Sequence, residues 1–214
     1  MKAGDPVSSP LCGIAILVGG NSRRLGQPKA CLHVGGRPLL QRVLDVTSSL
    51  DTPTWLVRAA EPAEALAELL DETGVPQLVD EYPDAGPLGG LATALAQTSC
   101  QRVLLLACDL PFLSSGFLRW LLDRSPHSTV VVPEDTDASH LHPLCAVYDR
   151  GCQTVLDQCL DSGRFRVHDF LARLDNKHIV PASKWQAFDT GGLLANINTE
   201  ADLAEARLKA GSEA

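Results

Sequence analysis

Glycines, two arginines and a lysine follow the first apolar segment of the chain. The run Gly13–Val18 is expected to be a buried strand, and it leads directly into LVGGNSRRLGQPK at residues 17–29. Glycines let a backbone approach a phosphate closely and leave N–H donors exposed. Ser22, the two guanidinium groups and Lys29 add charge-assisted donors. The string fits neither GxxxxGK[ST] nor GxGxxG, so it predicts a phosphate-binding loop of another kind. A glycine turn that merely ends the strand is the alternative, and it leaves the rest of the string unexplained.

A lone carboxylate ends the most apolar strand of the chain. Asp109 follows the run RVLLLAC at Arg102–Cys108, and ligands of open α/β sheets bind beyond the carboxyl ends of the strands. A hard cation that is shared with phosphates takes one or two protein carboxylates and keeps several waters. Asp109 is therefore the predicted Mg²⁺ ligand. A turn or helix-capping aspartate before Pro111 is the alternative.

The charge of the chain is distributed unevenly. The 214 residues carry 26 acidic and 18 basic side chains, a formal charge of −8. This acidic balance argues against a general nucleic-acid binder. From Pro6 to Leu44 there is no acidic residue, while Arg23, Arg24, Lys29, Arg37 and Arg42 are basic. A locally basic segment in an acidic protein predicts one small anionic ligand, and chance clustering on a solvated surface is the alternative.

The cysteines and the N-terminal segment bear on the compartment. Seven cysteines form no CxxC pair, and an odd number without a signal peptide indicates reduced thiols in structural roles. No apolar run is long enough to span a bilayer, and Met1–Pro10 has no apolar signal region. A cytoplasmic protein is expected. A redox protein built on the thiols is a further alternative, but it lacks a motif.

Apolar runs alternate with amphipathic segments along the chain, which is typical of a mostly parallel sheet covered by helices. The expected strands are Gly13–Val18, Thr54–Ala59, Gln77–Val79, Arg102–Cys108, Thr129–Val132 and Pro143–Tyr148. The expected helices are Pro38–Leu50, Pro62–Glu72, Gly89–Ala96, one from Ser115, Gly151–Asp161 and one from Thr199, where Asp202 completes a capping box. The right-handed crossover rule then predicts a single three-layer α/β/α sandwich. Residues 1–10 are expected to be a flexible extension, and residues 11–210 one domain.

The string at residues 17–29 resembles the signature LxGGxSxRMGxxK of the MobA-type nucleotidyltransferases, with Leu25 at the Met position. The resemblance implies a Rossmann-like fold of the nucleotide-diphospho-sugar transferase kind. It also implies nucleotidyl transfer from a nucleoside triphosphate with release of pyrophosphate. Gly19-Gly20 is similar to the guanylyl-transferring branch, because cytidylyl-transferring relatives typically carry Ala-Gly there.

Later stretches resemble the same family. They are Asp80–Pro83 with GPLGG from Gly86, CDLP at 108–111, His142-Pro143, GRFRV at 163–167, and NINTEADL at 196–203, which is similar to the family ending NxNTPEDL.

One position departs from the family pattern. Arg58 stands near the place where the family usually has an Asn that contacts the nucleotide, and an arginine cannot accept a hydrogen bond.

The resemblance implies guanylyl transfer from GTP to the phosphate of a molybdopterin-type cofactor, with Mg²⁺. Catalysis would fall to Lys29, Arg23 and Asp109, and nucleotide binding to Leu17, Val18, Gly19, Gly20, Ser22, Lys29, Asp80, Gly86 and Asp109. The acceptor would meet His142, Arg164, Arg166, Asn196 and Asn198. These residue sets imply a nucleotide-binding half at residues 11–112 and an acceptor-binding half at residues 113–210. The resemblance also implies transient contacts with proteins that insert or accept the cofactor. The alternatives are a cytidylyltransferase of the same cofactor, transfer to a sugar or small alcohol phosphate, and a non-catalytic nucleotide sensor.

Overall fold

The computed structural model describes residues 11–19, 26–124, 127–135 and 140–212. The strands are β1 (Cys12–Leu17), β2 (His33–Val34), β3 (Arg37–Pro38), β4 (Thr54–Arg58), β5 (Gln77–Val79), β6 (Arg102–Ala107), β7 (Val130–Pro133), β8 (Cys145–Asp149) and β9 (Lys177–Val180). The helices are α1 (Leu39–Thr47), α2 (Glu64–Thr73), α3 (Pro87–Gln97), α4 (Ser115–Leu122), α5 (Gln153–Asp161), α6 (Val167–Arg173), α7 (Ala182–Trp185) and α8 (Glu200–Ser212). The expected extension at residues 1–10 lies outside the described ranges.

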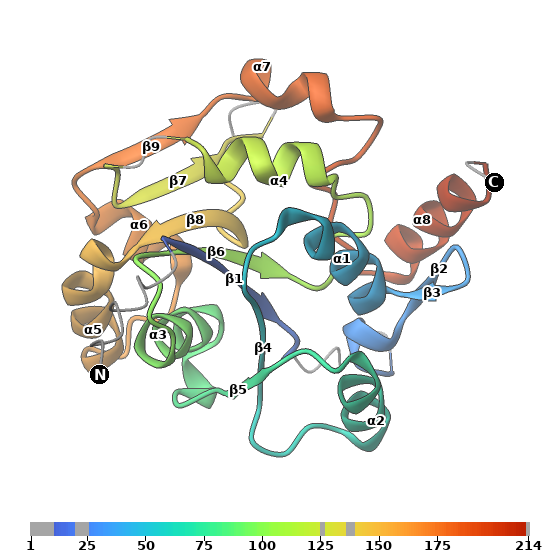
Figure 1. Ribbon diagram of the computed structural model, residues 1–214, viewed down its shortest axis with the longest axis horizontal. Coiled ribbons are helices and arrows are strands. Elements are labelled where there is room, and N and C mark those ends of the chain that lie inside the picture. The colour runs from blue at the N-terminus through green and yellow to red at the C-terminus, as the bar shows by residue number, and fades with distance from the viewer. Residues whose placement is uncertain (1–10, 20–25, 125–126, 136–139, 213–214) are drawn as a thin grey trace, which may run out of the picture.

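A mostly parallel sheet forms the middle layer, as predicted. Within the described ranges its seven strands lie in the order β5-β4-β1-β6-β8-β7-β9, with β1 and β6 side by side near its centre (Figure 1). Strands β1, β4, β5 and β6 pair in parallel, and β8 is antiparallel to both of its neighbours. The chain moves outward from β1 to β5 and then returns to the other side of β1. The carboxyl ends of β1 and β6 therefore border the topological switch point, where such sheets bind ligands.

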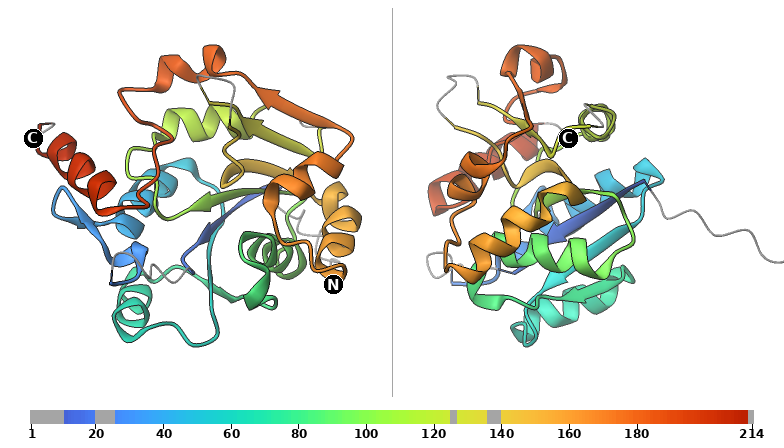
Figure 2. Two further views of the ribbon diagram at one scale, coloured as in Figure 1. Left: turned by 180° about the vertical axis from the view of Figure 1, so that it is seen from behind. Right: turned by 90° about the vertical axis from the view of Figure 1, so that its left-hand side faces the viewer.

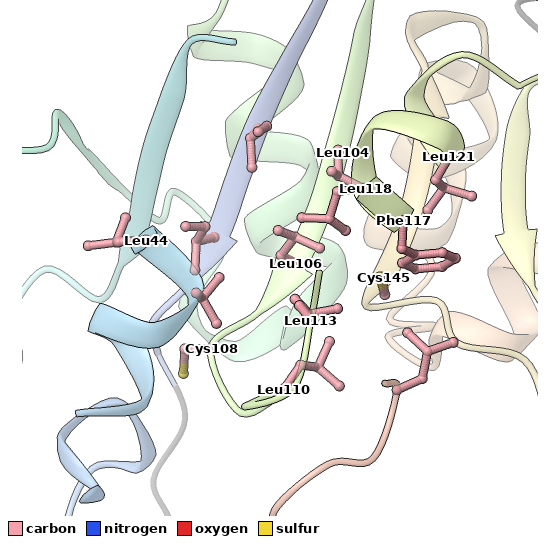
Figure 3. Packing of buried hydrophobic residues seen from close by; sticks show 14 of the residues in the cluster. Leu44, Leu104, Leu106, Cys108, Leu110, Leu113, Phe117, Leu118, Leu121 and Cys145 are labelled. Carbon is pink, nitrogen blue, oxygen red and sulfur yellow. The ribbon is translucent and has the colours of Figure 1, made fainter. Parts of the chain in front are cut away.

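Helices cover both faces of the sheet. One core joins residues of α1, α2 and α4 to the sheet, and the other joins residues of α3, α5 and α6. Figure 3 shows the first core, in which Phe117, Leu118 and Leu121 of α4 pack over Leu104 and Leu106 of β6. Every residue of β6 is buried. This explains why its sequence is a continuous apolar run rather than an alternating one.

A small third core attaches the C-terminal helix. Helix α8 lies beside the β2–β3 hairpin (Figure 2), and Leu203, Ala206 and Ala210 pack there with Leu32 and Val34. The predicted capping box is present. Asp202 Oδ2 accepts from the Thr199 N–H at 2.8 Å, and Thr199 Oγ1 accepts from the Asp202 N–H at 3.1 Å. None of the described helices has both the length and the hydropathy that a membrane crossing requires.

The predicted elements are confirmed with small shifts, and several short elements were missed. The expected helix Pro38–Leu50 divides into α1 and a 3₁₀ turn at Ser48–Leu50, and β8 begins at Cys145 rather than Pro143. The hairpin β2–β3, helices α6 and α7 and strand β9 were not predicted. Each has only two to seven residues, which is too short for a periodic apolar pattern to show.

Candidate active site

Three predicted residues from distant parts of the chain meet beyond the ends of β1 and β6. The Lys29 ammonium donates to Asp109 Oδ2 at 2.7 Å and to Asn198 Oδ1 at 2.7 Å. Asp109 is 7% exposed, and its Oδ1 is buried without a hydrogen-bond partner among the described residues. A buried carboxylate oxygen without a donor is costly. The arrangement is therefore prepared for a further cation or donor at Oδ1.

Backbone contacts hold this cluster together. The Ile197 N–H donates to the Asp109 carbonyl at 3.1 Å, and the Ile197 side chain is buried in the third core. Asn196 and Asn198 flank the buried Ile197 and are themselves exposed, outside that core. The packing of one isoleucine thus brings both predicted asparagines to the carboxyl end of β6.

A cavity of about 460 Å³ opens beside the cluster. It is lined by the ends of β1, β4 and β6, by Asp80 directly after β5, and by the start of α3. Seven of the residues predicted to bind nucleotide line it: Leu17, Val18, Gly19, Lys29, Asp80, Gly86 and Asp109. Among the described residues, the Ala59 nitrogen alone would lie near a Cβ added at Gly19, at 4.0 Å. The described part of the chain therefore leaves space for a ligand beside Gly19.

Asp80 is held in place by a network that the sequence analysis did not find. Its Oδ1 accepts from the Tyr82 N–H at 2.9 Å and from Thr93 Oγ1 at 3.2 Å. Thr93 is fully buried in α3 and also accepts from the Glu81 N–H. A Cβ on Gly89 would lie 2.3 Å from the Tyr82 carbonyl oxygen. The GPLGG segment is thus needed for close packing of α3 against this loop, as well as for its helix N-terminus.

Arg58, which departs from the family pattern, also lines this cavity. Its Nε donates to Gln77 Oε1 at 2.6 Å, and its Nη1 donates to the Ala59 and Ala60 carbonyls at 2.8 and 3.0 Å. These bonds join the end of β4 to edge strand β5 and to the following loop. The structure therefore gives Arg58 a local structural role.

A second, smaller cavity of about 220 Å³ lies on the other side of β6. It shares Ala107 and Leu144 with the first cavity. Predicted residues His142 and Asn196 line it, and so does His168, which the sequence analysis did not single out. The Nε2 atom of His142 is buried without a hydrogen-bond partner among the described residues. Burial lowers the pKa of the His142 imidazole, so the ring is neutral near pH 7.

Some predicted site residues are not brought into either cavity or are not described. Arg164 and Arg166 are exposed and line neither cavity. Gly20, Ser22 and Arg23 lie outside the described residues. The expected pair of acceptor-facing arginines is thus not found at the cavity walls.

The donor set fits a cation that is shared with a phosphate ligand. The described residues contain no group of three His, Cys, Asp or Glu side chains able to hold a metal by themselves. One carboxylate with an unpartnered buried oxygen and one amide oxygen, that of Asn198, suit a hard cation that completes its shell with phosphate oxygens and water. The nearby thiol is not a competing ligand, because burial raises the pKa of Cys108 to about 12 and keeps it protonated.

Comparison with known proteins gives consistent results over nearly the whole chain. The family model described as MobA-like NTP transferase domain matches residues 14–178. A Trichormus variabilis protein named probable molybdenum cofactor guanylyltransferase is 34% identical over 198 residues, 88% of this chain and 87% of its own. One from Desulfosudis oleivorans, named molybdenum cofactor guanylyltransferase, is 31% identical over 201 residues, 92% and 95% of the two chains. The crystal structure of molybdopterin-guanine dinucleotide biosynthesis protein A from Archaeoglobus fulgidus has a TM-score of 0.79 at 26% identity, with coverages of 94% and 99%.

Proposed function

The chain belongs to the MobA-like NTP transferase family, and from this membership we propose that it transfers a guanylyl group from GTP to the phosphate of molybdopterin. The observation that carries the proposal is the pair of adjoining cavities that meet at the end of β6. The larger contains the Lys29–Asp109 pair and the predicted nucleotide residues, and the smaller contains His142 and Asn196. This arrangement supports a nucleotide-binding half at residues 11–112 and an acceptor-binding half at residues 113–210.

In the proposed reaction an oxygen of the acceptor phosphate attacks the α-phosphorus of GTP. The new bond joins that oxygen to the α-phosphorus, and the bond from the α-phosphorus to the bridging oxygen of the β-phosphate breaks, so pyrophosphate leaves with that electron pair. The attacking phosphate is already ionised near pH 7 and needs no general base. Catalysis then depends on positioning and charge neutralisation. We assign Lys29 and Arg23 to the triphosphate, with Gly20 and Ser22 beside it.

We assign the metal position to Asp109, with Asn198 as a second oxygen ligand. Mg²⁺ bound there would offset negative charge on phosphate oxygens. Burial of the side chain and the hydrogen bond from the Ile197 N–H to the Asp109 carbonyl fix the position of Asp109. Lys29 neutralises that carboxylate when the nucleotide is not bound.

Guanine is the proposed base. The open space beside Gly19 supports this choice, because an alanine at this position would place a methyl group in the cavity. The names of the relatives support it independently. Asp80 is assigned to the base or ribose, since Oδ1 is occupied while Oδ2 has no hydrogen-bond partner among the described residues.

We assign the acceptor to His142, Asn196 and Asn198, and we assign to it also the exposed Arg164 and Arg166, which precede α6. Such an acceptor implies transient contacts with proteins that insert or receive the cofactor. The described cysteines, all seven of the chain, are free thiols, which is typical of a reducing compartment and supports a cytoplasmic location.

The test is product analysis after incubation of the full chain with Mg²⁺, molybdopterin and each of GTP, CTP, ATP and UTP. Formation of the guanine dinucleotide and pyrophosphate with GTP is expected. Thermal stabilisation by each nucleotide with Mg²⁺ gives a second measurement, and GTP should stabilise most. A preference for CTP in both measurements would replace guanylyl by cytidylyl transfer. Absence of any dinucleotide despite GTP binding would contradict the proposal that molybdopterin is the acceptor.

A further inference from the structure

The smaller cavity differs from the larger one in that no Asp, Glu, Lys or Arg is among its described lining residues. Its walls are formed by Ala107, Leu110, Leu141, His142, Pro143, Leu144, Cys145, His168 and Asn196. A phosphate group would need an ammonium or guanidinium group, or a cluster of backbone N–H donors. The ion pair of the site, Lys29 with Asp109, instead lies at the larger cavity. The smaller cavity is therefore unsuited to the charged part of a ligand.

Polar atoms converge on this cavity. The backbone of His142 is satisfied, since its N–H donates to the Pro133 carbonyl at 2.8 Å and its carbonyl accepts from the Cys145 N–H at 3.0 Å. The ring meets Trp185 edge-on, with centroids 6.5 Å apart and planes at 88°. Its buried Nε2 lacks a partner among the described residues. Buried polar atoms are nearly always paired, so a ligand polar group is the simplest partner for this nitrogen.

His168 brings a second imidazole to the same cavity from a different element. It is the second residue of α6, and its side chain is exposed. Phe170 and Leu171 of the same helix are buried in the core and fix the position of α6. His168 therefore contributes nothing to the core that would explain its place at the cavity wall.

We propose that the smaller cavity binds a flat, uncharged nitrogen heterocycle, the ring end of the acceptor, and that His168 is a contact residue that recognises its polar edge together with His142 and Asn196. The proposal depends on the proposed function for the identity of the acceptor. The lining leucines Leu110, Leu141 and Leu144 offer aliphatic contact to the faces of such a ring. Two imidazoles and an amide supply both donors and acceptors for its ring nitrogens and amino group. The phosphate of the same molecule then extends past Ala107 toward Lys29 and Asp109.

The binding test uses 6-hydroxymethylpterin, an uncharged fluorescent pterin without phosphate, titrated into the full chain. Saturable binding is expected for the unchanged protein. We expect His168→Ala to weaken it about tenfold and His142→Ala at least as much, because each removes a hydrogen-bond partner of the ring. His168→Asn, which keeps a donor and an acceptor, should restore part of the affinity. His127→Ala, an exposed histidine before β7, is the matched control and should bind within twofold of the unchanged protein.

A kinetic test separates ring recognition from a general structural effect. His168→Ala should raise KM for molybdopterin about tenfold while KM for GTP stays within twofold. Equal changes in both constants would overturn the proposal, and so would pterin affinity unchanged in His168→Ala. Displacement of the pterin by inorganic phosphate alone would also overturn it, because it would show an anion site.

The two hypotheses fail in different ways. Pterin binding that depends on His168, in a chain that transfers no nucleotide, would support the heterocycle site and contradict the proposed function. Guanylyl transfer with no His168 effect on acceptor KM or pterin affinity would support the function and contradict this inference.

Discussion

The two ends of strand β6 carry the two buried charged side chains among the described residues, and they use them differently. Arg102 begins the strand at 3% exposure, and Asp109 follows its other end at 7% exposure. Each has one buried atom without a hydrogen-bond partner in the described part of the chain, Nε of Arg102 and Oδ1 of Asp109. Each end also borders a cavity of about 460 Å³. Neither burial nor a cavity therefore distinguishes a functional charge from a structural one.

The hydrogen-bond and ion-pair partners of Arg102 and Asp109 distinguish the two side chains. Nη1 and Nη2 of Arg102 donate to the carbonyls of Leu122 and Arg124 at 3.1 and 2.9 Å. Arg102 thus caps the C-terminus of α4, where a cation satisfies the last carbonyls and opposes the helix dipole. Asp109 instead pairs with Lys29, a partly exposed side chain that a phosphate ligand can also bind. A charge with permanent main-chain partners is structural, whereas a charge with an exchangeable partner is available for chemistry.

The largest expected effect is at the carboxyl end. Asp109→Asn keeps the shape of the side chain but removes the charge that we assign to the metal. We expect kcat to fall by about 10³-fold, with the free energy of unfolding changed by less than about 1 kcal/mol because Lys29 is partly exposed. Steady-state kinetics and urea unfolding measure both values. Asp123→Asn, at the opposite end of the sheet, is the control and should keep kcat within twofold.

Lys29→Met should lower kcat about 10²-fold, because it removes a charge from the triphosphate site. Since Lys29 and Asp109 are in contact, the double variant should be little worse than Asp109→Asn alone. Full additivity of the two losses would show that the pair does not act as a unit. Lys184→Met, in α7, is the matched control.

Arg102→Met should affect stability and not chemistry. It leaves the Leu122 and Arg124 carbonyls without their donors, and we expect a loss of about 2 kcal/mol and a lower Tm by about 4–8 °C. Measured well below Tm, kcat should stay within twofold. A thousandfold loss of kcat without a change in Tm would place function at the amino end as well and break the comparison.

The smallest expected effect is a pH dependence of stability that comes from the carboxyl end. The pKa of His142 is lowered in the folded protein from its ordinary value of 6.5, so the unfolded chain binds the extra proton more readily. This contribution to the free energy of unfolding is fully present above pH 6.5, and it is lost progressively as the pH falls from 6.5 through the lowered pKa of the folded state. Urea unfolding between pH 5 and 8 should show a shallower slope in His142→Gln than in the unchanged protein. An equal pH dependence in both proteins would contradict the attribution of this effect to His142. The control variant His127→Gln should keep the pH dependence of the unchanged protein.

The elements that the sequence predicts best are those whose burial is simplest. Strand β6 is buried on both faces, so its continuous apolar run identified it, and the Thr199–Asp202 capping box identified the start of α8 because that motif is local. Strand β9 was missed because its four residues, KHIV, include a lysine and a histidine and alternate weakly. The hairpin β2–β3 has a Gly-Gly turn at Gly35-Gly36 but only two residues in each strand.

The same reasoning explains which site residues were found. Lys29, Asp80, Asp109, His142 and Asn196 stand in motifs whose residue types are informative in sequence, and each lies at a cavity wall. His168 was missed because it is one ordinary residue on a helix that was itself not predicted. Arg164 and Arg166 were chosen for their charge and motif, but the exposed segment before α6 leaves them outside both cavities.

By itself the sequence determined the fold class and the chemical character of the site, because burial patterns, glycine turns and phosphate-compatible side chains are properties of short segments. Only the tertiary structure decided which groups meet. Lys29 contacts Asp109 across 80 positions and Asn198 across 169. Such contacts depend on strand order and on the packing of residues such as Ile197, and no local pattern encodes that packing. For the same reason, the smaller cavity, which joins α6 to the segments after β6 and before β8, became visible only in the folded chain.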